Sequence, residues 1–218
     1  MAANDRRTLP TIIALVVTLG SAGVLLSKVE IVFAGTGHFM AYELIWWTML
    51  ALLLLYVRWG ERRPLTSVGF RKPGLRDILI SIATGILIFA GLVGIYFVIL
   101  PALHFQEDAH VTQLMNLMLA KPRWWRFTLI MRGAIAEEVL FRGYAIERLH
   151  ELTGSLKIAA TLSCTVFALE HLGVWSWGHV IIAGFAGAML SLLYIWRRNL
   201  WANSIAHFIP DAIGLLLN

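Results

Sequence analysis

The sequence predicts an all-α protein, a polytopic bundle of transmembrane helices in a single integral membrane domain of residues 1–218. Of the 218 residues, 59% are hydrophobic and only 14% are charged, and the mean hydropathy is +0.74. Soluble globular proteins have roughly 45–50% apolar and about 25% charged residues. Because a folded chain of this size exposes much of its surface, so apolar a chain needs lipid around it. The composition therefore excludes a soluble enzyme, a disordered tail and a nucleic-acid-binding module.

A helix needs about 20 mostly apolar residues to cross the hydrocarbon core of a bilayer. Seven segments approach or exceed this length and are predicted to span the membrane: residues 9–33, 39–59, 77–100, 124–149, 156–172, 178–196 and 200–217. The first segment follows Arg6 and Arg7, and Ser21–Gly23 resembles a signal-peptide cleavage site. Hydrophobicity resumes at Val24, so a retained anchor helix is favoured over a cleaved signal.

Basic residues predict the orientation of the bundle, because Lys and Arg concentrate in cytoplasmic loops. A cytoplasmic N-terminus places on that side Arg6, Arg7, Arg58, Arg62, Arg63, Arg71, Lys72, Arg76, Arg142, Arg148, Lys157, Arg197 and Arg198. The connection 101–123, with His104, Glu107, Asp108 and His110, is then expected outside, as is the C-terminus. We attribute the net charge of +5 to these loops and to anionic lipid headgroups, and expect no nucleic-acid partner.

Three groups of polar residues interrupt the apolar segments in the second half of the chain. They are Glu137, Glu138 and Arg142, then Glu170 and His171, then Asn203, His207 and Asp211. Ionisable side chains in hydrocarbon are costly, so they face the protein interior and point to function. Each group alone is as consistent with a structural role, and Glu170, near the outer end of its segment, is expected to be solvated or supporting. The three groups together favour a functional site.

The spacing of these residues predicts which side chains meet. Glu138 and Arg142 are four residues apart with the acid first, the favourable order for an ion pair within a helix. Glu137 points about 100° away from Glu138, so Arg142 need not neutralise it, and one carboxylate can stay chemically free. Phe167 precedes His171 by four residues, which places an aromatic ring beside the imidazole.

The last segment carries three polar residues at intervals of four. Asn203, His207 and Asp211 therefore lie along one stripe of a helix. Pro210 lacks an N–H group, which frees the carbonyl of Ala206 and predicts a kink at His207. The stripe predicts that all three side chains face one site.

Read in order, the polar motifs resemble those of a known family. Residues 137–143 have the form EExxFRG, residues 167–171 the form FxxxH, and residues 207–211 the form HxxxN or HxxxD. Each lies on its own apolar segment, and together they resemble the CPBP (Abi) family of intramembrane proteases. That family includes the type II CAAX prenyl endopeptidases and bacteriocin-processing or self-immunity proteins. The resemblance covers about residues 65–217, including the SVGF stretch at residues 67–70.

The resemblance implies a glutamate-dependent intramembrane endopeptidase with a catalytic core at about residues 112–217. Its pattern implies that Glu137 and His171 activate a water molecule, and that His207 and Asp211 stabilise the oxyanion. Supporting roles are expected for Glu138, Arg142, Phe167 and Asn203. The chemistry agrees with this, since a buried carboxylate is a plausible base and low dielectric strengthens oxyanion contacts.

Position 211 departs from the commoner pattern, in which Asn donates a hydrogen bond. An ionised Asp cannot donate one. Asp211 is therefore expected to act either as a protonated donor or as the group that orients His207, with Asn203 supplying an amide donor.

Four other readings stay open. A catalytically silent membrane scaffold, chaperone or bacteriocin-immunity protein would keep the same fold. A metal-dependent protease would use Glu137, His171 and His207 as zinc or iron ligands, although HExxH is lacking; no cofactor is expected, and zinc is the less favoured alternative. A cysteine protease is disfavoured, because an apolar helix surrounds Cys164 with nothing to activate its thiol. A transporter or channel is the weakest reading.

The expected partners are the lipid bilayer and a membrane-associated peptide or protein substrate. A prenylated C-terminal peptide, a bacteriocin leader and a C-terminal sorting tail all fit the sequence as substrates. The small size favours a multi-pass protein of the cell inner membrane. The oligomeric state is not predictable from the sequence.

Overall fold

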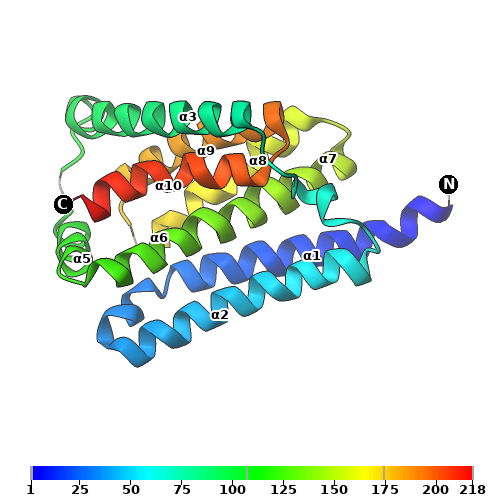
Figure 1. Ribbon diagram of the computed structural model, residues 1–218, viewed down its shortest axis with the longest axis horizontal. Helices are drawn as coiled ribbons and strands as arrows, with labels where there is room; N and C mark the ends of the chain where they lie inside the picture. The colour runs from blue at the N-terminus through cyan, green and yellow to red at the C-terminus, as the bar shows by residue number, and fades with distance from the viewer. Residues whose placement is uncertain (1, 107, 174, 218) are drawn as a thin grey trace.

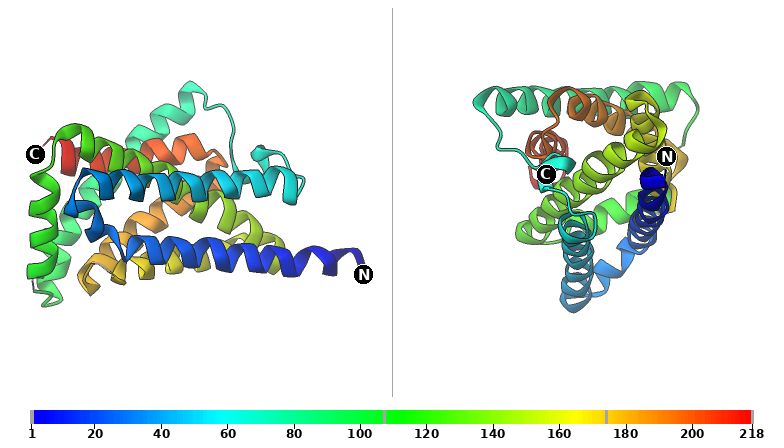
Figure 2. Two further views of the ribbon diagram at one scale, coloured as in Figure 1. Left: turned by 90° about the horizontal axis from the view of Figure 1, so that it is seen from below. Right: turned by 90° about the vertical axis from the view of Figure 1, so that its right-hand side faces the viewer.

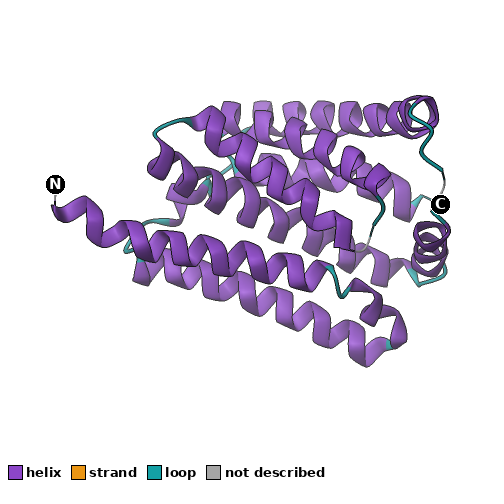
Figure 3. Ribbon diagram, turned by 180° about the vertical axis from the view of Figure 1, so that it is seen from behind, coloured by secondary structure: helices purple, strands orange, loops and turns teal. Residues whose placement is uncertain are grey.

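The computed structural model describes residues 2–106, 108–173 and 175–217, and for residues 2–7 it describes the backbone only. Glu107, expected in an outer connection, lies outside the described residues. The protein is 87% helical, and no strand occurs in the described ranges (Figure 3). The all-α prediction is therefore confirmed.

Each of the seven predicted segments is helical. The helices are α1 (Ala2–Leu26), η1 (Val29–Ala34), α2 (Thr36–Leu55) with η2 (Tyr56–Gly60), η3 (Leu65–Val68), α3 (Leu75–Gly94) with η4 (Ile95–Ile99) and α4 (Leu100–Ala102), α5 (Ala109–Leu119), α6 (Arg123–Glu137), η5 (Glu138–Ile146), α7 (Glu147–Thr153), α8 (Leu156–Glu170), η6 (His171–Gly173), α9 (Trp177–Arg197) and α10 (Leu200–Leu216).

Within the described part of the chain, four stretches are long and apolar enough to cross a membrane: Thr8–Leu26, Thr36–Gly60, Leu75–Ala102 and Trp177–Arg197. The other predicted spans are shorter or more polar, since α8 and α10 have 15 and 17 residues and α6 runs into the charged start of η5. Seven spans and a cytoplasmic N-terminus stay predictions.

The first predicted segment is broken, because α1 ends at Leu26 and not at residue 33. The polar residues Ser27, Lys28 and Glu30 begin a turn and a 3₁₀-helix, and the Tyr42 hydroxyl donates to the carbonyl of Leu25 at 3.0 Å. The same carbonyl accepts from the Lys28 backbone N–H at 3.1 Å, so two hydrogen bonds hold the end of α1.

The connection 101–123 contains a helix that the sequence did not predict. Asp108 caps α5, because its carboxylate accepts a hydrogen bond from the His110 backbone N–H at 2.9 Å. Figure 2 shows α5 lying across one end of the bundle, roughly perpendicular to α1 and α2.

The helices form layers around a central run made by α6, η5 and α7. In Figure 1, α1 and α2 form an antiparallel pair on one side of this run, and α3 and α9 lie on the other. Helix α10 packs against α3, α6 and α9, and α8 packs against α9 and η5. All nine residues of η5 are buried, so the polar start of this segment lies in the protein core.

The η5 segment is π-helical, whereas the sequence predicted a continuous α-helix over residues 124–149. A π-helix closes i→i+5 hydrogen bonds, and short π segments are frequent at functional sites. The wider turn changes the direction of each side chain from Glu138 onward, so the angle expected from 3.6 residues per turn does not apply there.

Gly143 lets the loop before α3 lie directly on η5. A Cβ atom at Gly143 would lie 2.6 Å from the carbonyl oxygen of Val68, closer than real contacts allow. Gly69, at φ 88°, then turns the chain in the left-handed region, and its carbonyl accepts from the Leu200 N–H at 2.9 Å. The SVGF stretch thus connects η5 to the start of α10.

Candidate active site

Glu138 is the centre of a buried polar cluster that joins η5 to α10. Its Oε1 accepts hydrogen bonds from Arg142 Nη1 at 2.9 Å and from His207 Nδ1 at 2.8 Å, and its Oε2 accepts from Asn203 Nδ2 at 3.1 Å. The Glu138, Arg142 and Asn203 side chains are fully buried. Three N–H donors around one carboxylate satisfy it as an anion without water.

Arg142 is held from three directions. Besides Glu138, its Nη2 donates to the Gly187 carbonyl at 3.3 Å, and its guanidinium lies 4.3 Å from the centre of the Phe167 ring. The predicted Glu138–Arg142 ion pair is therefore present. The Arg142 side chain is fully buried in the core, and its predicted place on the cytoplasmic side stays a prediction.

Glu137 has a different environment from its neighbour in the chain. Its side chain is nearly buried, with 7% exposed. Among the described residues, its carboxylate has no hydrogen-bond or ion-pair partner. Its charge acts on His171, His207 and Asp211, so the four ionisable groups lie within electrostatic reach of one another. The Glu138 carboxylate is thus fully hydrogen-bonded within the protein. The Glu137 carboxylate makes no such bond among the described residues and can bind water or substrate.

His171 lies where α8 passes into η6. Its Nδ1 is 2.7 Å from the carbonyl oxygen of Phe167. Because a carbonyl only accepts hydrogen bonds, Nδ1 carries the proton and Nε2 keeps a lone pair. The Phe167 ring meets the imidazole edge-on at 4.7 Å between centroids, as the spacing predicted.

Two further aromatic rings extend the His171 environment and were not predicted from the sequence. The His179 ring is stacked on His171 at 5.9 Å between centroids, and the Trp175 ring is stacked on His179 at 4.6 Å. Both residues lie beyond the family motif, Trp175 in the connection before α9 and His179 in the first turn of α9. A histidine eight positions from His171 was the only signal for them in the sequence.

On α10, the predicted stripe reaches the site, but its partners differ from expectation. The His207 Nε2 and Asp211 Oδ2 atoms are 3.7 Å apart, which permits a charge interaction but is too long for a hydrogen bond. Glu138, and not Asp211, makes the short contact that orients the imidazole. Asn203 Nδ2 donates to Glu138 and, at 2.7 Å, to the Leu190 carbonyl. Its amide hydrogens are therefore occupied, and the expectation of a free amide donor is wrong.

Two carboxylates outside the motif pattern are also shielded from water. Glu170 packs beside Gly23 of α1, and its Oε2 is buried without a partner among the described residues, so the expectation of a solvated group fails for that oxygen. Glu43 of α2 forms a buried ion pair with Arg132 of α6 at 3.1 Å. This pair was not predicted from the sequence, although an Arg in an apolar segment was a signal for it.

The metal alternative would need Glu137, His171 and His207 to converge on one ion. Among the residues that the structure describes, no group of three His, Cys, Asp or Glu side chains is arranged to hold a metal ion. The His207 Nδ1 atom is already directed at Glu138.

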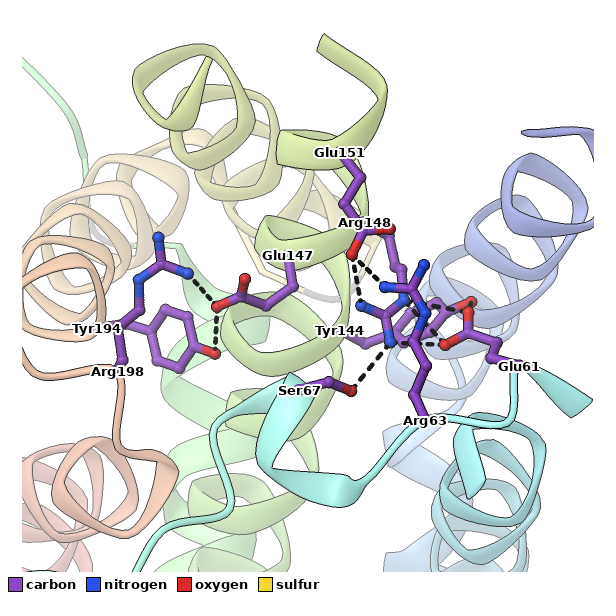
Figure 4. Close-up of polar contacts among 9 residues, drawn as sticks. All are labelled: Glu61, Arg63, Ser67, Tyr144, Glu147, Arg148, Glu151, Tyr194 and Arg198. Carbon is purple, nitrogen blue, oxygen red and sulfur yellow. Dashed lines mark hydrogen bonds and ion pairs between the residues drawn. The ribbon is translucent and has the colours of Figure 1, made fainter. Parts of the chain in front are cut away.

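A second polar network closes the end of the bundle at which α7 terminates (Figure 4). Arg148 binds Glu61 at 2.6 Å and donates to Ser67 at 3.3 Å, which ties α7 to the loop before α3. Glu147 accepts from Tyr194 at 2.9 Å and pairs with Arg198 at the end of α9. This network contains none of the predicted catalytic residues.

Fold and site together define an all-helical membrane protein with a carboxylate–imidazole cluster at its core. Residues 119–213, less than half of the chain, match the family model described as type II CAAX prenyl endopeptidase Rce1-like. The match contains every predicted site residue and supports the resemblance to the CPBP and CAAX-type proteases. The matched family is one of peptidases. Among curated proteins and solved structures, none matches the chain.

Proposed function

We propose that this protein is a multi-pass endopeptidase of the cell inner membrane that hydrolyses a peptide bond with water activated by Glu137 and His171. One observation carries the proposal: Glu137 is a buried carboxylate without a partner among the described residues, within electrostatic reach of the His171 imidazole, whose Nε2 keeps a lone pair. The expected substrate is a membrane-associated peptide or protein.

The proposed reaction balances with the groups present. Water donates a hydrogen bond to His171 Nε2 and gives a proton to the Glu137 carboxylate as its oxygen attacks the scissile carbonyl carbon. The carbonyl electrons move to oxygen, and the resulting oxyanion faces His207 and Asp211. When the C–N bond breaks, the departing amine takes the proton from Glu137, which returns to its carboxylate form.

Glu138 has a positioning role in this proposal. It holds the His207 ring through Nδ1, so that Nε2 is left toward Asp211 and the substrate. The same carboxylate fixes Arg142 and Asn203. A silent scaffold would have no need for an unpartnered buried carboxylate at Glu137, which is costly in such surroundings.

Glu137→Gln and Glu138→Gln distinguish the two carboxylates. Glu137→Gln should lower cleavage about 10²–10⁴-fold, the usual contribution of a general base, with an unchanged Tm. Glu138→Gln should lower both Tm and activity, because breaking a buried ion pair costs about 3–5 kcal/mol. The measurements are thermal unfolding of the detergent-purified protein and mass spectrometry of new termini in a peptide library. Full activity of Glu137→Gln would refute the proposed base.

A further inference from the structure

The two ends of the bundle differ in charge. The ends of α2, α7 and α9, with the loops that join them to the next helices, hold Arg58, Arg62, Arg63, Arg71, Lys72, Arg76, Arg148, Lys157, Arg197 and Arg198. At the opposite end, the connections carry fewer basic residues: Lys28, Lys121, Arg123 and Arg126. By the preference of Lys and Arg for the cytoplasm, the first end is cytoplasmic.

The cytoplasmic end is closed beneath the catalytic residues. Phe141, Tyr144 and Ile146 of η5 are fully buried there, as is Leu200 at the start of α10. The Arg148 network of Figure 4 forms a second layer outside them, and Arg148 itself is buried. A substrate segment has no open route to Glu137 through these two layers.

Exposure increases along α10 in the opposite direction. Helix α10 begins beside Asn199 at the cytoplasmic end. Asn203 is fully buried, the His207 side chain is 12% exposed, and the Asp211 side chain is 40% exposed. Because an α-helix rises 1.5 Å per residue, each of these three residues lies farther from the cytoplasmic end than the one before it. The stripe is thus buried at its cytoplasmic end and becomes more exposed toward its outer end.

A cavity at the outer end lies beside His179. It has a volume of about 240 Å³ and is lined by residues that include Leu100, Asp108, Thr112, Ser176, His179 and Ile182. His179 is the residue stacked on His171. The cavity therefore lies among the outer connections, near α5 and the start of α9, and the stacked His179 ring separates it from His171.

We propose that the site takes its substrate from the non-cytoplasmic side of the membrane. The inference rests on the proposed protease function and specifies the side of the membrane from which the substrate enters. The substrate is then an exported or membrane-anchored polypeptide whose scissile bond lies at or just inside the outer surface, such as a C-terminal sorting tail. A prenylated C-terminus on the cytoplasmic leaflet would meet the closed end of the bundle.

Single cysteines test this sidedness without requiring catalysis. In a Cys164→Ala background, Asp211→Cys should react with a membrane-impermeant maleimide in spheroplasts and not in inside-out vesicles. Gly214→Cys is a second probe, because an added Cβ there meets no atom within 4 Å. The matched controls are His104→Cys, expected to react only in spheroplasts, and Arg71→Cys, expected to react only in inside-out vesicles. Reaction of the α10 probes from the cytoplasmic side, or from neither side, overturns the proposal.

A second measurement separates this proposal from the protease function. Wild-type protein in sealed spheroplasts and in inside-out vesicles is given the same impermeant peptide library, and cleavage is compared. Cleavage on the spheroplast side alone is expected, and cleavage on the inside-out side alone overturns the sidedness while it supports the protease. Absence of cleavage on both sides, even after detergent is added, refutes the protease function, whereas the cysteine labelling still decides the orientation of the site.

Discussion

At the residue scale, two adjacent glutamates differ because their surroundings differ. Glu138 accepts hydrogen bonds from Arg142, Asn203 and His207, which stabilise it as an anion and leave no capacity for chemistry. Glu137, one residue earlier, has a nearly buried carboxylate within electrostatic reach of His171 and His207. The two carboxylates differ because different side chains from other helices reach each of them.

Asp211 gives a prediction that separates its two possible roles. Asp211→Asn should keep substantial turnover, because Asn is nearly isosteric and supplies an amide donor. Asp211→Ala should lose about 10²–10³-fold in rate, as is typical when an oxyanion donor is removed. Single-turnover cleavage by both variants, at equal Tm, is the measurement.

The outcome for Asp211→Asn is the informative one. If it proves as inactive as Asp211→Ala, then a negative charge 3.7 Å from His207 Nε2 is what the reaction needs, and the donor role is refuted. If both variants keep wild-type rates, Asp211 has no part in turnover and His207 acts with Glu138 alone.

At the element scale, the close approach of α9 to α8 and η5 keeps Arg142 in place. A Cβ at Gly187 would lie 2.9 Å from Phe167 Cδ1 and 3.3 Å from Arg142 Nη2. Both groups are buried, so neither can move away easily. The glycine is therefore part of the support for Glu138, through a contact that no sequence motif revealed.

Gly187→Ala should lower stability by about 1–3 kcal/mol, the usual cost of overpacking, and should reduce cleavage because Arg142 shifts. Gly184→Ala is the matched control on the same helix, because its Cβ would meet Ala168 Cβ at an ordinary 3.7 Å. Thermal unfolding and peptide cleavage of both variants are the measurements. Equal Tm for the two variants would show that α9 accommodates the extra methyl group.

At the scale of the whole molecule, the proposed reaction requires no metal ion. We expect cleavage by the purified protein to survive exhaustive chelation, because Glu137 and His171 supply the base and the water-orienting group. The measurement combines cleavage of the peptide library with determination of the metal content of the same sample. Stoichiometric zinc, with activity lost on chelation and restored by added zinc, would support the metal-dependent alternative.

Composition and periodicity by themselves determined the fold class and most helix positions. An apolar fraction of 59% requires lipid around the chain, and long apolar runs form helices whatever their neighbours, since backbone hydrogen bonds must be satisfied locally in a membrane. The Glu138–Arg142 pair and the Phe167–His171 contact were also predictable, because both follow from spacing along a single helix.

Only the tertiary structure decided what depends on contacts between helices. The π-helical geometry of η5, the contact of Glu138 with His207, and the use of the Asn203 amide by Glu138 and Leu190 join groups up to 69 residues apart. The polar network at the end of α7 likewise arises where α7, α9 and the loop before α3 meet. Local sequence specifies a helix and its faces, but the partner of each face is set by packing, which brings distant segments together.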